Sequence, residues 1–269
     1  MKLTVIGCSG SMSGRRGAAS SYLLQAKGIA DGGLERTFSV VLDFGPGAMG
    51  QLLEYVDPAM LDAMVFSHLH ADHCADIVGM QVYRRWHPEG ALPPVTVYSP
   101  GDGMRRTRQI ADDAPEETYA GEFDFVRVAP GSAVRIGPMM FEFFQAEHTV
   151  EALSLRVTGP SEAESRTGES RTVVFSFTGD TDYCDGALAA ARGVDLLLSE
   201  AAFEEGRDEV RGVHLTGTRA GELAHDAGAK QVVLTHLQPW TDADKTERDA
   251  SQAYGGKVEL AEPGAVYEI

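Results

Sequence analysis

Four side chains that can bind a divalent cation lie within six positions of the sequence, in the segment VFSHLHADHC. They are His68, His70, Asp72 and His73. Imidazole nitrogens and carboxylate oxygens are the ligands that ions such as Zn²⁺ and Mn²⁺ bind in proteins. A single ion could not readily take all four side chains from so tight a loop. The spacing therefore predicts two ions, each held by a pair of these ligands.

Three further candidate ligands stand where predicted strands end. His148 follows FEFFQAE, Asp180 follows VVFSFTG and His236 follows VVLT. In layered α/β proteins, binding sites gather at the carboxyl ends of strands, so these side chains are expected beside the histidine cluster. Six or seven side chains would then hold two cations. The carboxylate of Asp180 is the best placed of them to bridge the two ions.

The elements that must position these residues follow from short apolar runs and from helical periodicity. Period-two alternation, or short apolar runs bounded by Gly, Pro or Asp, predicts strands at residues 2–7, 20–26, 38–45, 63–68, 94–100, 123–129, 139–148, 152–157, 172–180, 194–200, 231–236 and 265–269. Helices are predicted at roughly 47–56, 73–86, 103–113, 185–192, 216–227 and 242–253. Strands that come first and then alternate with helices indicate the α/β class, with sheets covered by helices.

The connections indicate a single domain over residues 1–269. The segment 158–172 is polar and rich in Gly, Ser and Glu, and it lies between two predicted strands, so it is predicted to be a long hairpin loop. A shorter connection of the same kind is predicted near 26–37. No stretch has the composition of a linker, and 269 residues with 43% hydrophobic residues supply an ample core.

The composition of the chain indicates where the protein is located in the cell and which partners it can bind. No window reaches the roughly eighteen apolar residues of a membrane span, and too few residues precede Cys8 for a secretory signal, so a cytoplasmic protein without a membrane partner is expected. Three scattered cysteines do not predict a disulfide framework. A net charge of −17 disfavours a large nucleic acid as a partner, although a metal centre can still attract a small anion.

Six segments together resemble the metallo-β-lactamase superfamily, and most closely its phosphodiesterase branch, which includes ribonuclease Z. They are HLHADH, AEHT, FTGDTDY, SEAAF, HLTGTRAGELA and VVLTHLQP, and they span nearly the whole chain. The resemblance implies a four-layer αββα sandwich with a dinuclear metal centre at one edge. Zn²⁺ is the first candidate for both ions and Mn²⁺ is the second. The implied ligand sets are His68, His70 and His148 for one metal and Asp72, His73 and His236 for the other, with Asp180 as the bridge.

The same resemblance implies a proton donor beside the metals. Glu200 in SEAAF and His214 in HLTG match a glutamate and a histidine that pair beside the leaving phosphate in the ribonuclease Z-like branch. Glu200 would orient His214 and stabilise its charge, and His214 would donate a proton to the leaving oxygen or hold the phosphate. Asp72 would also steer the attacking water. The implied catalytic residues are therefore Asp72, Glu200 and His214.

Within this resemblance, several features favour a small phosphodiester. Relatives that process tRNA carry a long basic arm between the elements that match His148 and Asp180, whereas only 31 residues separate the two here. The segment 158–172 holds three glutamates and two arginines, which would make a poor tRNA clamp. The chain most resembles bacterial cyclic-nucleotide phosphodiesterases of the atypical class II, which implies hydrolysis of 3′,5′-cyclic AMP to 5′-AMP as the first candidate reaction. Five arginines could guide the phosphate, but as charges of surface helices they are left out of the predicted site: Arg84, Arg85, Arg105, Arg106 and Arg108.

Three alternatives remain open. The first is a ribonuclease Z-like tRNA 3′-endonuclease with a reduced arm. The second is a lactonase or thioesterase, which would want an apolar pocket and no role for His214. The third is a metal-binding protein without catalysis. The resemblance also allows a homodimer, and Cys74, His87 and His225 are expected to lie outside the metal centre.

Overall fold

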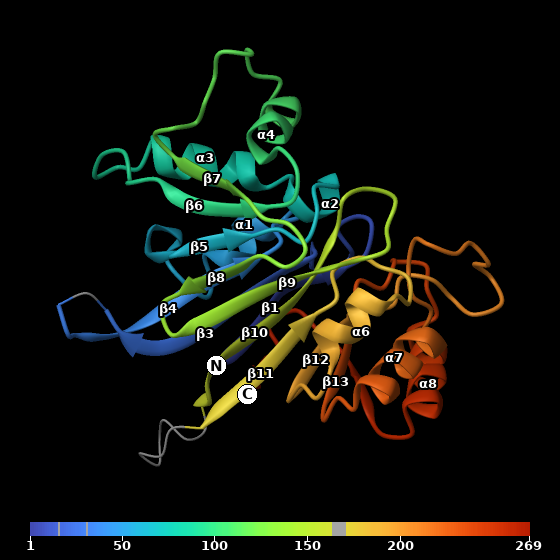
Figure 1. Ribbon diagram of the computed structural model, residues 1–269. Coiled ribbons are helices and arrows are strands. Elements are labelled where there is room, and N and C mark those ends of the chain that lie inside the picture. Colours follow the sequence, from blue (N-terminus) through green and yellow to red (C-terminus); the bar gives the residue numbers. More distant parts are fainter. Residues whose placement is uncertain (16, 31, 163–170) are drawn as a thin grey trace.

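Two β-sheets face each other in the middle of the molecule, and helices cover the outer face of each sheet (Figure 1). The computed structural model describes residues 1–15, 17–30, 32–162 and 171–269. The first sheet comes from the N-terminal half of the chain and from the last strand. In spatial order it contains β15 (Val266–Glu268), β1 (Lys2–Ser9), β3 (Ser21–Ile29), β4 (Glu35–Leu42), β5 (Ala63–Val65), β6 (Val95–Ser99) and β7 (Phe123–Arg127), with β2 (Ala18–Ala19) beside β1.

The second sheet comes from the C-terminal half. In spatial order it contains β14 (Val258–Leu260), β13 (Val232–Thr235), β12 (Leu196–Glu200), β11 (Thr172–Phe177), β10 (Leu153–Pro160), β9 (Met139–Gln145) and β8 (Ala133–Ile136). Each sheet has a parallel part, from β4 to β7 in the first and from β11 to β14 in the second. The loops at the carboxyl ends of such strands are where ligand sites gather.

Helices pack on both outer faces. On the first sheet lie α1 (Ala48–Leu52), α3 (Ile77–Arg85) and α4 (Gly103–Ala111), and on the second lie α6 (Asp185–Ala191), α7 (Gly217–Ala227) and α8 (Ala243–Tyr254). A short turn of helix, α2 (Ala71–Cys74), leads into α3, and a 3-10 turn (Pro58–Met60) precedes β5.

Three hydrophobic clusters fill the three interfaces between these layers. The largest lies between the two sheets and includes Tyr22 and Phe177, whose ring centroids are 5.1 Å apart. A second joins α1 and α3 to the first sheet through side chains such as Leu52 and Met80. A third, rich in alanine and leucine, joins α6, α7 and α8 to the second sheet. Burying one large apolar side chain stabilises a fold by roughly 1.5–3 kcal/mol. These clusters therefore stabilise the packing of the layers against one another. The order helix, sheet, sheet, helix confirms the αββα sandwich that the resemblance implied.

The predicted helix 73–86 is wrong in one respect, because it is two helices. α2 ends at Cys74 and α3 begins at Ile77. At the junction the backbone N–H of Asp76 donates to the carbonyl of Phe44, 3.1 Å away, instead of to a carbonyl one turn earlier. The carboxylate of Asp76 also accepts a hydrogen bond from the backbone N–H of Met49 (2.8 Å), which ties the junction to α1.

Other element boundaries also differ from the prediction. The connection predicted near 26–37 is mostly strand, because β3 runs to Ile29 and β4 begins at Glu35. β2, β8 and β14 were not predicted, since none of these short strands lies in an apolar run like the one that marked β5. In the predicted loop 158–172, the strands β10 and β11 pair as far as Pro160 and Thr172, and residues 163–170 lie outside the described residues. No described helix is both long enough and apolar enough to cross a membrane.

Candidate metal centre

The seven predicted ligands come together at one edge of the sandwich, in loops from both sheets. His68 and His70 lie in the loop after β5, and Asp72 and His73 lie in α2. The other three follow strands of the second sheet, namely β9, β11 and β13. They are His148, Asp180 and His236.

For three of these ligands, the preceding strand ends earlier in the sequence than we predicted. Each of β5, β9 and β11 stops three residues before the ligand that follows it. The alternation of side chains along a strand therefore does not orient His68 and His70, and loop geometry does so instead. β13 delivers His236 directly, and the backbone of His236 then takes a positive φ of 60°. This uncommon conformation for a residue with a side chain is secured by a hydrogen bond from its N–H to the carbonyl of Cys8 (3.0 Å).

One group of ligands consists of His68, His70 and His148. The Nδ1 of His70 lies 3.1 Å from the Nε2 of His68 and 3.1 Å from the Nε2 of His148. Nitrogens bound to one tetrahedral zinc ion at the usual bond length are about 3.3 Å apart, so this spacing suits a shared ion. The Nδ1 of His148 donates to the carbonyl of Val213 (2.8 Å). This bond fixes the tautomer and leaves Nε2 for the metal.

The second group consists of Asp72, His73, Asp180 and His236. The Nε2 atoms of His73 and His236 are 3.1 Å apart. The Oδ2 of Asp72 lies 3.2 Å from the Nε2 of His236 and 3.4 Å from that of His73. One ligand atom from each of the four residues lies within 4.8 Å of the others. The group therefore offers two nitrogens and two carboxylates to a single cation.

Asp180 lies between the two groups. Its Oδ2 is 3.2 Å from the Nε2 of His73 in one group and 3.7 Å from the Nε2 of His68 in the other. Its Oδ1 is buried and has no hydrogen-bond partner among the described residues. A buried carboxylate oxygen without a partner is costly, and a neighbouring cation removes that cost. The position fits the bridging role that the resemblance implied.

The charge states of His68 and Asp180 also fit cations. Burial, together with the neighbouring His73, holds the pKa of His68 well below its usual range, so its ring is neutral as a metal ligand must be. Burial alone would raise the pKa of Asp180, but the surrounding histidines, His236 foremost, hold that pKa well below its usual range. His73 differs, because burial alone would lower its pKa but the carboxylates of Asp180 and Asp43 raise that pKa well above its usual range, so its ring must lose a proton to bind a metal. Neutral imidazoles and ionised carboxylates are the forms that a divalent ion binds. The residues present therefore fit two divalent cations.

Asp43 and Ser67 support the ligands and were not predicted. The Oδ2 of Asp43, which is fully buried after β4, accepts hydrogen bonds from the Nδ1 of His73 (2.7 Å) and from the hydroxyl of Ser67 (2.8 Å). The Ser67 oxygen also lies 3.1 Å from the Nδ1 of His68. A carboxylate on the outer nitrogen of a ligating histidine fixes its tautomer and makes it a stronger ligand. The sequence did carry a signal, because Asp43 directly follows an apolar strand as His236 does.

Glu200 and His214 form the predicted pair. The Nδ1 of His214 donates to the Oε1 of Glu200 (2.8 Å), and this fully buried glutamate also accepts hydrogen bonds from the backbone N–H groups of Thr181 and Ala202. Burial lowers the pKa of His214, but the Glu200 carboxylate outweighs burial and raises that pKa to about 9. Phe203 packs edge-on against the imidazole at 4.9 Å. The pair therefore presents a protonated imidazole with its Nε2 left for another partner.

His214 also falls into two further groups of atoms that could hold a metal. One group includes His148 and Asp180, and the other includes Glu200 and His236. The hydrogen bond to Glu200 already uses one ring nitrogen of His214. We therefore keep the seven residues above as the ligand set and treat His214 as an acid beside it.

Asp182 holds the segment that precedes His214. The sequence did not predict this role. Its carboxylate, 1% exposed, accepts hydrogen bonds from the Nε of Arg211 (2.6 Å) and from the backbone N–H of Gly212 (2.8 Å), and it pairs with Arg219. The next residue, Val213, is the one whose carbonyl faces a metal ligand. The buried carboxylate of Asp182 thus positions both the Val213 carbonyl, which supports the ligand His148, and the proton donor His214.

The remaining histidines and Cys74 lie outside the ligand groups, as predicted. The thiol of Cys74 donates to the carbonyl of His70 (3.1 Å), so it faces away from the ligand atoms. His225 is exposed on α7, with its Nδ1 3.2 Å from the carbonyl of Tyr254. His87 is half-buried near the end of α3 and accepts a hydrogen bond from a backbone N–H two residues on.

Comparison with known proteins gives matches along the whole chain. A family model described as the beta-lactamase superfamily domain matches residues 39–237. An uncharacterised protein of Mycobacterium leprae is 35% identical, over all of this chain and 89% of that protein. The probable metallo-hydrolase YhfI of Bacillus subtilis is 29% identical over the full length of both chains. Ribonuclease Z of Myxococcus xanthus is 28% identical, over 86% of this chain and 88% of that enzyme.

Solved structures agree with this result. The crystal structure of YhfI from Bacillus subtilis, described as a metallo-beta-lactamase fold protein, matches with a TM-score of 0.82 at 26% identity. The match covers 100% of this chain and 99% of that chain. A diphosphatase of the PhnP family matches with a TM-score of 0.71 at 19% identity, which shows a likeness of fold.

Proposed function

The chain belongs to the metallo-β-lactamase superfamily and is a metal-dependent hydrolase, and from that premise we propose that it hydrolyses a small phosphodiester, with 3′,5′-cyclic AMP as the first candidate and 5′-AMP as the product. The observation that carries the proposal is the Glu200–His214 pair beside two groups of metal ligands. Such a pair serves a leaving alkoxide, which needs a proton. Similarity to ribonuclease Z over most of the chain supports a phosphodiester as the substrate class.

Two divalent ions at the seven ligands, Zn²⁺ as first candidate and Mn²⁺ as second, would activate a water molecule and neutralise the charge of the phosphate. The protein supplies the rest. Asp72 is more exposed than the other carboxylate of its group, with 17% of its side chain accessible against 3% for Asp180. Asp72 can therefore accept a hydrogen bond from the attacking water and orient it.

His214 completes the reaction. With its Nδ1 bound to Glu200, its Nε2 carries the proton that the leaving oxygen needs. The water oxygen joins phosphorus, the bond from phosphorus to the 3′ oxygen breaks, and that oxygen takes the proton from Nε2. Glu200 stabilises the charged imidazole before the transfer, as a buried carboxylate does for a positioned general acid.

Two features support a small substrate over tRNA. Of the 31 residues between His148 and Asp180, β10 and β11 take 8 and 6, and the two strands pair with each other as far as Pro160 and Thr172, so at most residues 161–171 remain for a protruding arm. The net charge of −17 repels a polyanion, whereas a cyclic nucleotide carries one charge that the metals and His214 can meet.

A homodimer is the second part of the proposal. Several large apolar side chains are exposed on the outer layer of the first sheet, around α1, the 3-10 turn and α3. Exposed apolar patches of this kind commonly mark an interface between proteins. The residues are Leu53, Met60, Val82 and Trp86. Sedimentation of the protein as a dimer, and of a Trp86→Glu variant as a monomer, is expected.

A hydrolysis screen tests the main proposal. The metal-free protein is loaded with Zn²⁺ or Mn²⁺ and incubated separately with cyclic AMP, cyclic GMP, bis(p-nitrophenyl) phosphate, an acyl-homoserine lactone and a precursor tRNA. We expect 5′-AMP from cyclic AMP and far slower cleavage of the tRNA. Efficient tRNA cleavage without any cyclic AMP hydrolysis would favour the tRNA 3′-endonuclease instead. Turnover of the lactone alone would favour a lactonase.

A further inference from the structure

Three of the five arginines near α3 and α4 are held by the fold, and one of them, Arg84, is buried rather than on the surface as predicted. Arg84 and Arg108 donate hydrogen bonds to main-chain carbonyl groups. Arg85 pairs with Glu117 and Glu122. Arg84 and Arg85 are therefore held by several hydrogen bonds each, whereas Arg108 has one and its buried Nε has no hydrogen-bond partner among the described residues.

Arg105 and Arg106, in the first turn of α4, differ from Arg85 because no carboxylate in the described part of the chain neutralises them. Among the described residues, no carboxylate lies within ion-pair distance of either side chain. The Nε of Arg106 donates to the carbonyl of Leu69 (2.9 Å), the residue between the ligands His68 and His70. This hydrogen bond places the Arg106 side chain against the loop that carries His68 and His70.

Both arginines line a cavity of about 160 Å³ next to that group. Its walls also include Leu69, Gln109 and Val150, and Val150 follows the ligand His148 by two residues. The cavity is thus bordered by the two loops that carry the first metal group. Its volume is well below the roughly 300–1,000 Å³ of pockets that enclose a drug-sized molecule. It has room for one charged group rather than for a nucleoside.

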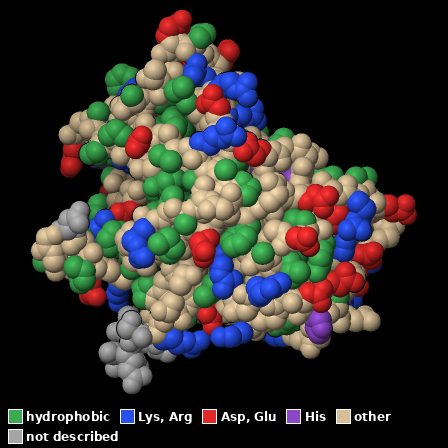
Figure 2. Space-filling model, in the orientation of Figure 1, with side chains coloured by type: hydrophobic (Ala, Val, Ile, Leu, Met, Phe, Trp, Pro, Cys, Tyr) green, Lys and Arg blue, Asp and Glu red, His purple; other side chains and the backbone are tan. Residues whose placement is uncertain are grey.

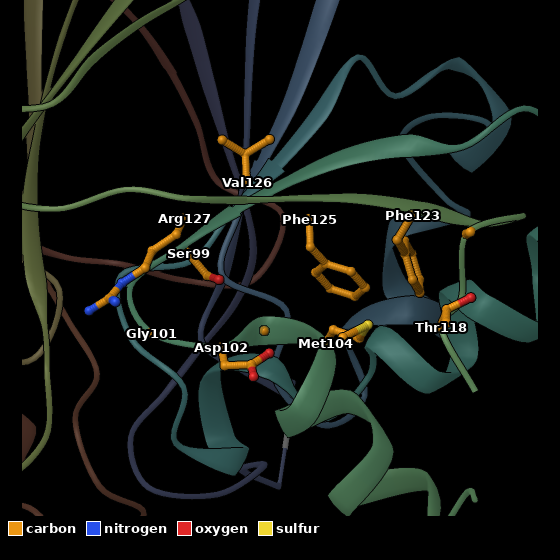
Figure 3. Close-up of a pocket in the computed structure, with 11 residues that line it drawn as sticks. Ser99, Gly101, Asp102, Met104, Thr118, Phe123, Phe125, Val126 and Arg127 are labelled. Atoms are coloured by element: carbon orange, nitrogen blue, oxygen red, sulfur yellow. The ribbon is translucent and has the colours of Figure 1, made fainter. Parts of the chain in front are cut away.

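Two carboxylates also border this cavity, and both have partners. The Oδ1 of Asp102 accepts a hydrogen bond from the backbone N–H of Arg105 (2.9 Å). Glu151 accepts hydrogen bonds from Arg127 at 3.1 and 3.2 Å. Figure 3 shows Asp102 and Arg127 toward one end of the adjoining cavity of about 530 Å³, away from its aromatic side chains.

Positive charge therefore remains available here in a protein whose net charge is −17. Lys and Arg side chains gather over α4 in Figure 2, close to the edge where the metal ligands lie. Arginine forks bind phosphate oxygens well, through charge-assisted hydrogen bonds.

We propose that Arg105 and Arg106 bind a second phosphate of the substrate while its scissile phosphodiester lies at the metal centre. The inference rests on the proposed phosphodiesterase activity and narrows its substrate class. Small phosphodiesters that carry a further phosphate, such as a linear dinucleotide with a terminal phosphate, are bound more tightly than cyclic AMP. Two such arginines increase affinity by roughly tenfold or more.

Equilibrium binding tests this without requiring turnover. The Mn²⁺-loaded protein is titrated calorimetrically with 5′-AMP, which has one phosphate, and with adenosine 3′,5′-bisphosphate, which has two. The bisphosphate is expected to bind about tenfold more tightly. Arg105→Gln and Arg106→Gln each reduce this advantage, and the double variant removes it. Arg248→Gln is the matched control, because it removes one charge from an exposed position on α8 and keeps the full advantage.

Arg106→Gln also breaks the hydrogen bond to Leu69, so metal content is measured for every variant. If that variant loses metal, Arg105→Gln alone carries the test. Equal affinities of the wild-type protein for the two nucleotides, or an advantage that survives in the double variant, would overturn the proposal. Inorganic phosphate is titrated in parallel, and an equal loss of its affinity in Arg105→Gln would assign the site to a free anion and overturn it as well. Absence of cyclic AMP hydrolysis would refute only the proposed substrate.

Discussion

The histidines of this centre have two different roles. Most direct a ring nitrogen toward a metal position, whereas the Nδ1 of His214 is directed toward a carboxylate. The Nδ1 of His70 lies 3.1 Å from the Nε2 of His148 and 3.1 Å from the Nε2 of His68, so these nitrogens face one another. The Nδ1 of His214 is instead turned to Glu200, at 2.8 Å. The first arrangement holds metal, and the second holds a proton.

Replacing His214 by Ala should keep both metals and lower phosphodiester turnover by roughly 10²–10⁴-fold, the usual contribution of a positioned acid. Glu200→Gln should lower turnover by less, because the amide still orients the imidazole but no longer stabilises its charge. Steady-state kcat and the metal content of the same samples are the measurements. His225→Ala, a change at an exposed histidine of α7, is the control and should behave as wild type. Release of metal by His214→Ala, with unchanged activity per bound metal, would make His214 a ligand.

Which residues the sequence could predict depends on how each one acts. His68 and Asp180 act through their own donor atoms, so residue type and spacing were enough to select them. Asp43 acts through His73, at 2.7 Å, from a strand distant in sequence. Asp182 acts through backbone groups and remote arginines. A position after an apolar strand marked Asp43 as a candidate, but no local pattern shows that it supports His73, because that role exists only once the chain has folded.

Among the elements, the segment before α7 is the one whose position matters most. Residues 211–213 have no regular structure, and Asp182 holds them by hydrogen bonds to Arg211 and to the backbone of Gly212. α7 then begins just beyond the acid, with the Thr216 hydroxyl capping it. The acid is thus fixed from both sides.

Asp182→Asn should therefore weaken both the positioning of His214 and the binding of the metal that His148 ligates. Breaking a buried ion pair costs about 3–5 kcal/mol, and loss of a supporting group of a ligand lowers metal affinity or activity by roughly 10–100-fold. Melting temperature, kcat and the metal retained after brief chelation are the measurements. Asp226→Asn, which removes the partner of the neighbouring Tyr183 hydroxyl (2.7 Å), is the control. Full metal retention and full activity in Asp182→Asn would show that the segment needs no such support.

The β10–β11 hairpin should tolerate change at its far end. Pro160 and Thr172 pair at that end, while Asp180 follows β11 at the other. Replacing residues 163–170 by a short Gly/Ser linker should alter cyclic AMP turnover less than twofold, since the six residue pairs of the hairpin separate the linker from the ligands. The measurement is kcat/KM of the metal-loaded variant. A large loss with intact metal content would mean that this segment reaches the substrate.

Element prediction succeeded where the apolar runs were long. β3 and β9 hold seven residues or more and carry clear patterns. β14 holds three residues and is a strand only because β13 lies beside it. The break between α2 and α3 depends on a carbonyl of Phe44, which the sequence does not place there.

At the scale of the whole molecule, the metal centre joins the two halves of the sandwich. Four of its ligands come from the first half of the chain and three from the second. A cation that binds only the folded state stabilises it by about 2.7 kcal/mol at a hundred times its Kd.

Removing the metals should therefore lower the melting temperature by roughly 5–10 °C. Calorimetry of chelated and reloaded protein is the measurement, and Zn²⁺ should restore the loss. A His236→Ala variant should gain less from the same metal. Identical melting of the chelated and loaded protein would argue against two firmly bound ions.

The sandwich itself was reached from the sequence by resemblance more than by pattern. Strand and helix order indicated only the α/β class. The return of β15 to pair with β1 at the edge of the first sheet joins strands that are far apart in the sequence. The pairing places Ala265, Tyr267 and Ile269 against the core between the two sheets, and no window of the sequence contains both strands.

Because the ligands come from both halves of the chain, they become available at different times during protein synthesis. A ribosome releases His68 to His73 early, His148 and Asp180 later, and His236 last of all. Chains generally fold from the N-terminus as they emerge, so a nascent chain exposes the first cluster long before its partners exist. Neither cation can be enclosed, and no acid is in place, until the second sheet has formed. A translation product that ends before His236 consequently lacks one ligand of the second metal group, and we expect it to be inactive as a hydrolase.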